Sequence, residues 1–296
     1  MPRTAPKKDP KEAGKKPSYS KEKQSPPGHE QEMTPRADHG EESYKPGTRL
    51  TDKVAIITGG DSGIGRAVAI AFAREGADVV LSYLKEEEED ARETAKWVEE
   101  AGRKAVLAPG DVQKSKYCKE LAETAVKKLG RLDIVVNNAG FQRTYEQPED
   151  VPEEEFERTF RTNIFGTFFL SQAALPHLEK GSSIINTASI QAFDPSPNLL
   201  AYAPTKAAIA NFTKALAKAV GSRGIRVNAV APGPVWTPLI PSTMPEEKVE
   251  KFGSDTAFQR AAQPAELAPL YVFLASDEAT YVTGEVYGAT GGQTPV

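Results

Sequence analysis

The chain has 296 residues, a formal net charge of −4 and one cysteine, Cys118. A single cysteine excludes a disulfide framework and a multi-cysteine metal site, and the three histidines are scattered, so we expect no metal. No apolar run reaches the roughly 18 residues of a membrane span, and no signal-peptide core follows the N-terminus, so we expect a cytoplasmic protein with no membrane partner.

Residues 1–47 differ from the rest of the chain. They are rich in proline, more basic than acidic, and contain no Leu, Ile, Val or Phe. Such a segment buries too little apolar surface to offset its ordering entropy, so we expect a disordered or extended tail over 1–47 and a domain over 48–296. The Lys-rich stretch from Lys7 to Lys23 leaves open a contact with a polyanion. Solvated disorder is favoured, and no nucleic-acid partner is expected, because Tyr19 is the lone aromatic residue there.

From residue 53 onward, short apolar runs alternate with helical patterns that end at glycines. The pattern predicts strands at 54–57, 79–81, 105–107, 132–136, 183–186, 225–230 and 285–288. It predicts helices at about 66–75, 90–101, 115–129, 152–178 and 204–220. Strands joined by crossover helices indicate an α/β fold: a single Rossmann-type, doubly wound, parallel seven-stranded sheet with helices on both faces. In such sheets a ligand binds beyond the carboxyl ends of the strands.

A glycine-rich turn from Thr58 to Gly65 links the first strand to the first helix. Glycines allow a tight turn and a close approach to a pyrophosphate, and a helix N-terminus supplies free N–H groups. The T-G-x-x-x-G-x-G spacing differs from the common dinucleotide fingerprint. An ordinary structural turn is the alternative, but the position between a buried strand and a helix favours dinucleotide binding.

Four polar residues form a candidate catalytic set. Tyr202 and Lys206 are four residues apart at the start of a predicted helix, and therefore lie on one face. A nearby ammonium is expected to lower the phenol pKa toward neutrality, so that Tyr202 can exchange a proton with a substrate oxygen. Ser189 follows the fifth strand, and Asn163 lies inside a predicted helix. Each has an ordinary alternative, a solvated face or a cap, and only their conjunction is specific.

These motifs, together with Asp111-Val112, Asn137 to Gly140 and Pro232-Gly233, resemble the short-chain dehydrogenase/reductase family over residues 50–296. The resemblance implies that Tyr202 is the general acid/base, Lys206 lowers its pKa and binds the nicotinamide ribose, Ser189 polarises the substrate oxygen, and Asn163 anchors a proton-relay water. Pro204, within the Tyr-Lys segment, departs from the pattern. The turn, the run from Ala231 to Ile240 and parts of the tail resemble the branch of glucose and ribitol dehydrogenase homologs, which includes bacterial general-stress oxidoreductases and NADP-dependent aldehyde reductases.

The resemblance and the strand ends together give the expected cofactor contacts. No carboxylate ends the second strand, where NAD specificity usually needs one, and Lys85 is placed to pair with a 2′-phosphate, so NADP(H) is favoured over NAD(H). The acidic run after Lys85 argues the other way. The expected cofactor residues are Gly59, Asp61, Ser62, Gly63, Ile64, Gly65, Tyr83, Lys85, Asp111, Val112, Asn138, Ala139, Gly140, Tyr202, Lys206, Pro232, Gly233, Val235 and Thr237.

The substrate is expected over the nicotinamide, beyond strands four to six. Its candidate contacts are Ser189, Gln142, Gln191, Trp236, Phe193 and Leu239, and residues 238–262 are expected to form a mobile lid. The expected function is hydride transfer between a nicotinamide cofactor and an aldehyde, sugar or polyol. The alternatives are an epimerase or dehydratase, and a redox-sensing binding protein without turnover. The resemblance implies a homotetramer built through the helices at 152–178 and 204–220, with Phe165, Phe168, Phe169, Phe212 and Leu216 in that interface or in the core.

Overall fold

The computed structural model describes residues 9–12, 14, 16, 18–20 and 23–293. Its centre is a seven-stranded sheet in the order β3-β2-β1-β4-β5-β6-β7, with every pair parallel. The strands are β1 (Val54–Thr58), β2 (Asp78–Tyr83), β3 (Ala105–Pro109), β4 (Ile134–Asn137), β5 (Ser183–Thr187), β6 (Arg226–Pro232) and β7 (Val286–Ala289). The four central strands are fully buried, because helices cover both faces of the sheet, and this explains their continuous apolar runs. The predicted fold class is confirmed.

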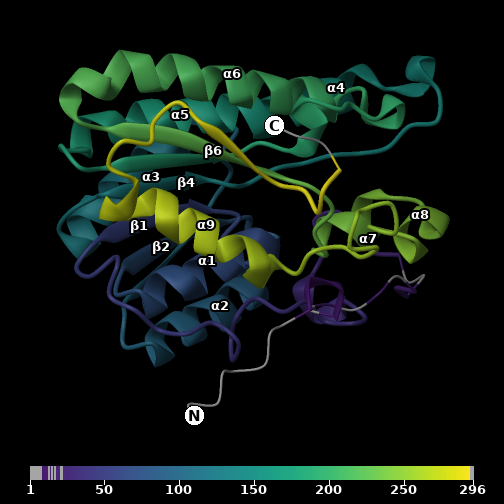
Figure 1. Ribbon diagram of the computed structural model, residues 1–296. Helices are drawn as coiled ribbons and strands as arrows, with labels where there is room; N and C mark the ends of the chain where they lie inside the picture. Colours follow the sequence, from purple (N-terminus) through teal and green to yellow (C-terminus); the bar gives the residue numbers. More distant parts are fainter. Residues whose placement is uncertain (1–8, 13, 15, 17, 21–22, 294–296) are drawn as a thin grey trace, which may run out of the picture.

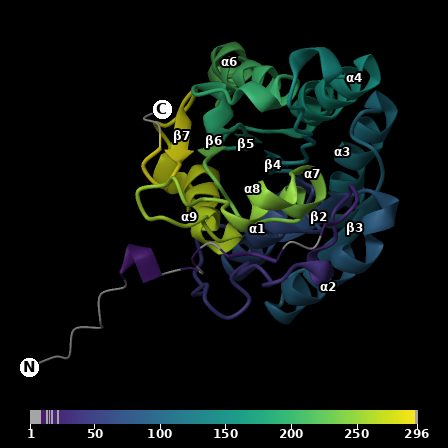
Figure 2. The ribbon, with the colours of Figure 1, turned by 90° about the vertical axis from the view of Figure 1, so that its right-hand side faces the viewer.

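Helices form one layer on each face of the sheet (Figures 1 and 2). On one face α1 (Gly63–Arg74), α2 (Glu88–Glu100) and α9 (Pro264–Ala275) pack in a core with Ile57 and Leu81. On the other face α3 (Ser115–Leu129), α5 (Gly166–Ala174) and α6 (Tyr202–Val220) pack against Ile56 and Val135. Alternate residues of β1 thus point to opposite layers, as strand geometry requires. The strand order reverses between β1 and β4, which places the switch point at their carboxyl ends.

The long helix expected at 152–178 is broken into segments. It consists of α4 (Glu153–Phe160), a π-helical turn (Arg161–Phe165), α5, and a 3₁₀ turn (Leu175–His177). A π turn inserts one extra residue and shifts the facing of the side chains, which is common at functional sites. Here the turn directs the Asn163 side chain into the buried interior.

Sequence reasoning missed three helices: α7 (Leu239–Thr243), α8 (Glu246–Glu250) and α9. Helix α9 is apolar on nearly all sides and contains Pro264 and Pro269, so it shows neither an amphipathic period nor a proline-free interior. It covers the sheet beside α1, where an apolar surface on every side is favourable. Among the described residues, no helix is long and apolar enough to span a membrane.

The expected tail does not behave as one unpacked segment. Glu30, Met33 and His39 are buried against the domain, and Met33 joins a small core with Trp236. The expectation of disorder is therefore wrong for this part, while the extended alternative fits its path, which contains only short 3₁₀ turns. Much of the Lys-rich stretch, including Lys7, Lys8, Lys15 and Lys21, lies outside the described residues.

Candidate active site

A cavity of about 1030 Å³ opens at the carboxyl ends of the strands, between the sheet and the short helices α7 and α8. It is lined by the glycine-rich turn, by the ends of β2 and β4 to β6, by the start of α6, and by residues 26–28 of the N-terminal segment. The cavity therefore lies at the switch point of the sheet, where ligands of this fold class bind. Its volume suits a dinucleotide and a small substrate.

The glycines of the turn are needed because the backbone is tightly packed there. A Cβ on Gly65 would lie 1.8 Å from the carbonyl oxygen of Gly59, and a Cβ on Gly63, which has φ +49°, would lie 2.9 Å from Thr237. The turn thus brings bare backbone to the cavity at the N-terminus of α1, whose first N–H groups have no partner within the helix. These residues fit the diphosphate of a dinucleotide.

Two acidic side chains line the cavity near the end of β2. Asp61 is 1% exposed, and neither of its carboxylate oxygens has a hydrogen-bond partner among the described residues. Burial raises the pKa of Asp61 to about 6. Burial, followed by the charge of Asp61, raises the pKa of Glu87 to about 8. A buried acceptor without a partner is costly, so Asp61 fits a ligand that brings hydroxyl donors, such as a ribose.

Tyr202 and Ser189 meet at the inner end of the cavity. Tyr202 begins α6, and Ser189 follows β5 as the cap of a 3₁₀ turn, where its oxygen accepts the N–H of Gln191 at 3.2 Å. Burial raises the pKa of Tyr202 to about 12, and a hydrogen bond with Ser189 lowers it in part. The phenol is therefore protonated at neutral pH, and the expected shift of its pKa toward neutrality is not found.

Lys206 lies one helical turn after Tyr202, with its ammonium 5.3 Å from the centre of the Tyr202 ring. The ammonium donates to the carbonyl oxygen of Thr187 at 2.8 Å and also lines the cavity. Burial lowers the pKa of Lys206 to about 7, and no carboxylate among the described residues pairs with its ammonium.

Asn163 is fully buried and does not line the cavity. Its side-chain oxygen accepts the N–H of Phe141 at 2.8 Å, and its amide donates to the Phe141 carbonyl at 2.9 Å and to the Thr205 hydroxyl at 3.0 Å. Its side chain therefore fixes the turn after β4 to the helix that bears Tyr202. The expected role as the anchor of a relay water stays a prediction, and the side-chain oxygen can still accept a second hydrogen bond.

With this geometry established, comparison with known proteins decides the family. A family model described as enoyl-(acyl carrier protein) reductase matches residues 59–294. The chain belongs to the short-chain dehydrogenase/reductase family. It is 52% identical to general stress protein 39 of Bacillus subtilis, with 90% of this chain and 93% of that protein covered. It is 46% identical to the chloroplastic NADPH-dependent aldehyde reductase 1 of Arabidopsis thaliana, over 90% of this chain and 94% of that one.

A solved relative has the same fold. The short-chain dehydrogenase of Burkholderia cenocepacia, crystallised in complex with NADP, superimposes with a TM-score of 0.77 at 32% identity, and the match covers 82% of this chain and 98% of that chain. The expected family, its general-stress branch and the activity class are confirmed. This short-chain dehydrogenase/reductase is a nicotinamide-dependent oxidoreductase that acts on a small molecule.

Most of the residues expected to contact the cofactor line the cavity of this short-chain dehydrogenase/reductase, and two do not. Lys85 is exposed and does not line the cavity, so its expected contact with a 2′-phosphate stays a prediction. Gly65 lies beneath the turn and acts by its close packing on Gly59. Sequence reasoning missed Leu84, Glu87 and Gln113, which line the same end of the cavity. They lie in the segments that follow β2 and β3, and this place is the signal that could have identified them.

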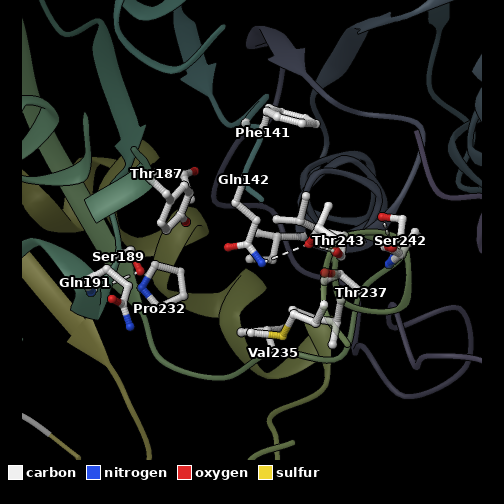
Figure 3. A pocket seen from close by; sticks show the side chains of 18 of the residues that line it. Phe141, Gln142, Thr187, Ser189, Gln191, Pro232, Val235, Thr237, Ser242 and Thr243 are labelled. Carbon is white, nitrogen blue, oxygen red and sulfur yellow. Dashed lines mark hydrogen bonds between the residues drawn. The ribbon is translucent and has the colours of Figure 1, made fainter. Parts of the chain in front are cut away.

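The substrate candidates divide in the same way. Gln142 and Gln191 line the cavity, and Figure 3 shows the Gln142 amide directed at Thr243 of α7, to whose hydroxyl it donates at 3.1 Å. Gln191 is held by Ser196, since the two side chains bond at 3.0 Å. Leu239 lines the cavity and Phe193 does not.

Trp236 is a correction to the expected substrate contacts. Its ring is 1% exposed, does not line the cavity, and stacks on Tyr19 with the ring centres 3.9 Å apart. Its indole N–H donates to the carbonyl oxygen of Pro35 at 2.8 Å. Trp236 therefore anchors the N-terminal segment. The sequence did not indicate this role, because the segment was expected not to pack on the domain.

Proposed function

We propose that this enzyme reduces the carbonyl of a small aldehyde, or of a sugar in its open form, to an alcohol, with NADPH as the preferred donor. The bound nicotinamide supplies the hydride. The observation that carries the proposal is the Tyr202 hydroxyl, which faces a large cavity beside the glycine-rich turn and, because burial raises its pKa, keeps its proton at neutral pH. A neutral phenol is the form that can donate a proton to a carbonyl oxygen as the alkoxide develops.

The side chains around Tyr202 suggest separate roles. The Ser189 hydroxyl is placed to donate to the same substrate oxygen and to orient it toward Tyr202. Lys206, tied to the Thr187 carbonyl, presents its amine to the cavity, where it can hold a ribose hydroxyl and restore a proton to Tyr202. Asn163 acts as a positioning residue, because it links the turn at Phe141 to α6 through Thr205.

The names of two relatives and the residues at the end of β2 support the preference for NADPH. The aldehyde reductase relative is named as NADPH-dependent and the Burkholderia structure holds NADP. The end of β2 also carries Tyr83 and Leu84 rather than a carboxylate. Against it, Asp61 and Glu87 line the same end of the cavity and would repel a 2′-phosphate once ionised. The pKa of Glu87, raised to about 8, keeps that acid mostly protonated at neutral pH and reduces the repulsion, whereas Asp61, with a pKa of about 6, is mostly ionised there.

A panel of aldehydes, open-chain sugars and polyols, followed by the absorbance of reduced nicotinamide, tests both parts of the proposal. Tyr202→Phe should lower kcat by about 10²- to 10⁴-fold and leave the Kd of the dinucleotide unchanged, because only the proton donor is lost. Tyr271→Phe is the matched control, since that buried hydroxyl bonds Thr187 and does not line the cavity. Activity retained by Tyr202→Phe would sink the mechanism. A higher kcat/KM with NADH would overturn the cofactor preference, and binding without turnover by the wild type would favour the redox-sensor alternative.

We also propose that the enzyme is a cytoplasmic homotetramer. Phe165 and Phe168 on the α5 side are 43% and 44% exposed, while Phe212 of α6 packs against Phe168 in an edge-on contact. Exposed aromatic side chains grouped on one face favour a protein interface. A monomeric mass in sedimentation would refute the tetramer, and recovery in the membrane fraction would refute the location.

A further inference from the structure

The N-terminal strap, defined as residues 23–40, runs along the cavity and joins three parts of the site. Pro26, Pro27 and Gly28 line the cavity. The Gln24 N–H donates to the Pro241 carbonyl of α7 at 3.2 Å. A Cβ on Gly28 would lie 2.5 Å from the carbonyl oxygen of Pro238, so the strap is in close contact with the start of α7. The strap is thus built into the wall of the site.

One side chain of the strap reaches the N-terminus of α1. The Glu30 carboxylate is 2% exposed and accepts the N–H of Gly63, the first residue of α1, at 2.9 Å. The Glu30 backbone N–H donates to Asp90 of α2 at 2.9 Å. The second carboxylate oxygen of Glu30 is buried with no hydrogen-bond partner among the described residues. An anion therefore already occupies one N–H group of the turn that faces the cavity.

His39 compensates the charge of Glu30. Its Nε2 lies 3.2 Å from the Glu30 carboxylate, and its Nδ1 lies 3.0 Å from Glu41. His39 is buried, which by itself lowers its pKa, but the two carboxylates outweigh this and raise the pKa to about 9. The pKa of Glu30 is lowered by His39, by Arg66 and by the Gly63 N–H, all against the effect of burial. At neutral pH the pair is a buried carboxylate and imidazolium.

We propose that the strap completes the dinucleotide site and that Glu30, balanced by His39, is a positioning residue that sets how tightly the diphosphate is held at α1. The positive end of a helix attracts anions, and a carboxylate there reduces what remains for a second anion. Glu30 accepts the Gly63 N–H, so that N–H is no longer available to a ligand. The next residue of the turn, Ile64, lines the cavity and remains available to the ligand. The proposal rests on cofactor binding at this turn and not on the substrate or the choice between NADPH and NADH.

Calorimetric titration at pH 8, where Glu30 is ionised and His39 still carries its proton, tests the proposal with NADPH, NADH and adenosine as probes. Glu30→Gln keeps an acceptor for the Gly63 N–H and removes the charge, so both dinucleotides should bind about fivefold more tightly. His39→Gln leaves the Glu30 charge uncompensated and should weaken both by a similar factor. The Kd of adenosine, which has no phosphate, should change less than twofold in either variant. Glu32→Gln, an exposed neighbour in the same 3₁₀ turn, should change nothing.

The proposal is supported if Glu30→Gln lowers and His39→Gln raises the Kd of both dinucleotides while the Kd of adenosine stays nearly constant. Equal changes for adenosine, shifts of the same sign in both variants, or no shift would overturn it in favour of a purely structural strap. If His39→Gln does not fold, the isosteric Glu30→Gln decides alone, and an unchanged or weaker dinucleotide Kd refutes the proposal. A wild-type protein that binds neither dinucleotide would instead refute the cofactor site on which the proposed function depends.

Discussion

Replacing Lys206 with methionine is expected to stabilise the cofactor-free protein while removing activity. Lys206 is 2% exposed, and its ammonium donates a hydrogen bond to the Thr187 carbonyl at 2.8 Å. Methionine has a similar length and no charge, so it fills the same space without the cost of desolvation. Active-site residues that oppose stability in this way are a recognised source of trade-off between stability and function.

The magnitude follows from the pKa. Burial lowers the pKa of Lys206 from 10.5 to about 7, and at about 1.36 kcal/mol per pKa unit this costs the wild type roughly 4 kcal/mol at pH 7. In the variant the Thr187 carbonyl loses its hydrogen-bond donor, and this costs about 1–3 kcal/mol of stability. Lys206→Met should therefore raise the free energy of unfolding by about 2 kcal/mol at pH 7.

The sign of the pH dependence provides an independent check. Between pH 7 and 10.5 the unfolded chain holds a proton on Lys206 that the folded chain has released, so the stability of the wild type rises with pH across this window. Methionine does not titrate, so the advantage of the variant should shrink steadily as the pH rises through this window.

Urea unfolding of both proteins from pH 6.5 to 10 measures this difference, and Lys214→Met provides the control. Lys214 is exposed on the same helix, α6, and should change stability by less than about 0.5 kcal/mol. A Lys206→Met protein that is less stable than the wild type at pH 7, or whose advantage is constant with pH, would refute the reasoning.

Two further substitutions test the packing of the site. Trp236→Ala removes the ring that stacks on Tyr19, and should lower the free energy of unfolding by about 3–5 kcal/mol in urea; a loss below about 1 kcal/mol would show that the N-terminal segment is not anchored there. Gly65→Ala places a Cβ 1.8 Å from the Gly59 carbonyl oxygen, and overpacking should cost about 1–3 kcal/mol and weaken dinucleotide binding. A Cβ on Gly221 would meet nothing within 4 Å, so Gly221→Ala should leave the Tm nearly unchanged when both variants are compared by thermal melting. Equal Tm losses in the two variants would contradict the clash.

The sequence by itself determined the sheet and most of the site. Continuous apolar runs mark strands that are buried on both faces, and the alternation with helices requires parallel crossovers, so the fold follows from local pattern. Because strand ends meet at one edge, positions after strands identified Ser189, Gly140 and Asp111 as neighbours of one cavity. The spacing of Tyr202 and Lys206 placed both on one face of α6, and both line that cavity.

Only the tertiary structure decided the protonation states and the place of the N-terminal strap. A pKa depends on burial and neighbours from every direction, and the pattern Tyr-x-x-x-Lys could not show that burial raises the pKa of Tyr202 and lowers that of Lys206. The strap has almost no apolar residues, so composition indicates disorder. It is held by single long-range contacts, Glu30 on Gly63 and Trp236 on Pro35, that join positions 33 and 201 residues apart. Contacts of that kind leave no local period in a sequence, and here they hold a segment that forms part of the cavity wall.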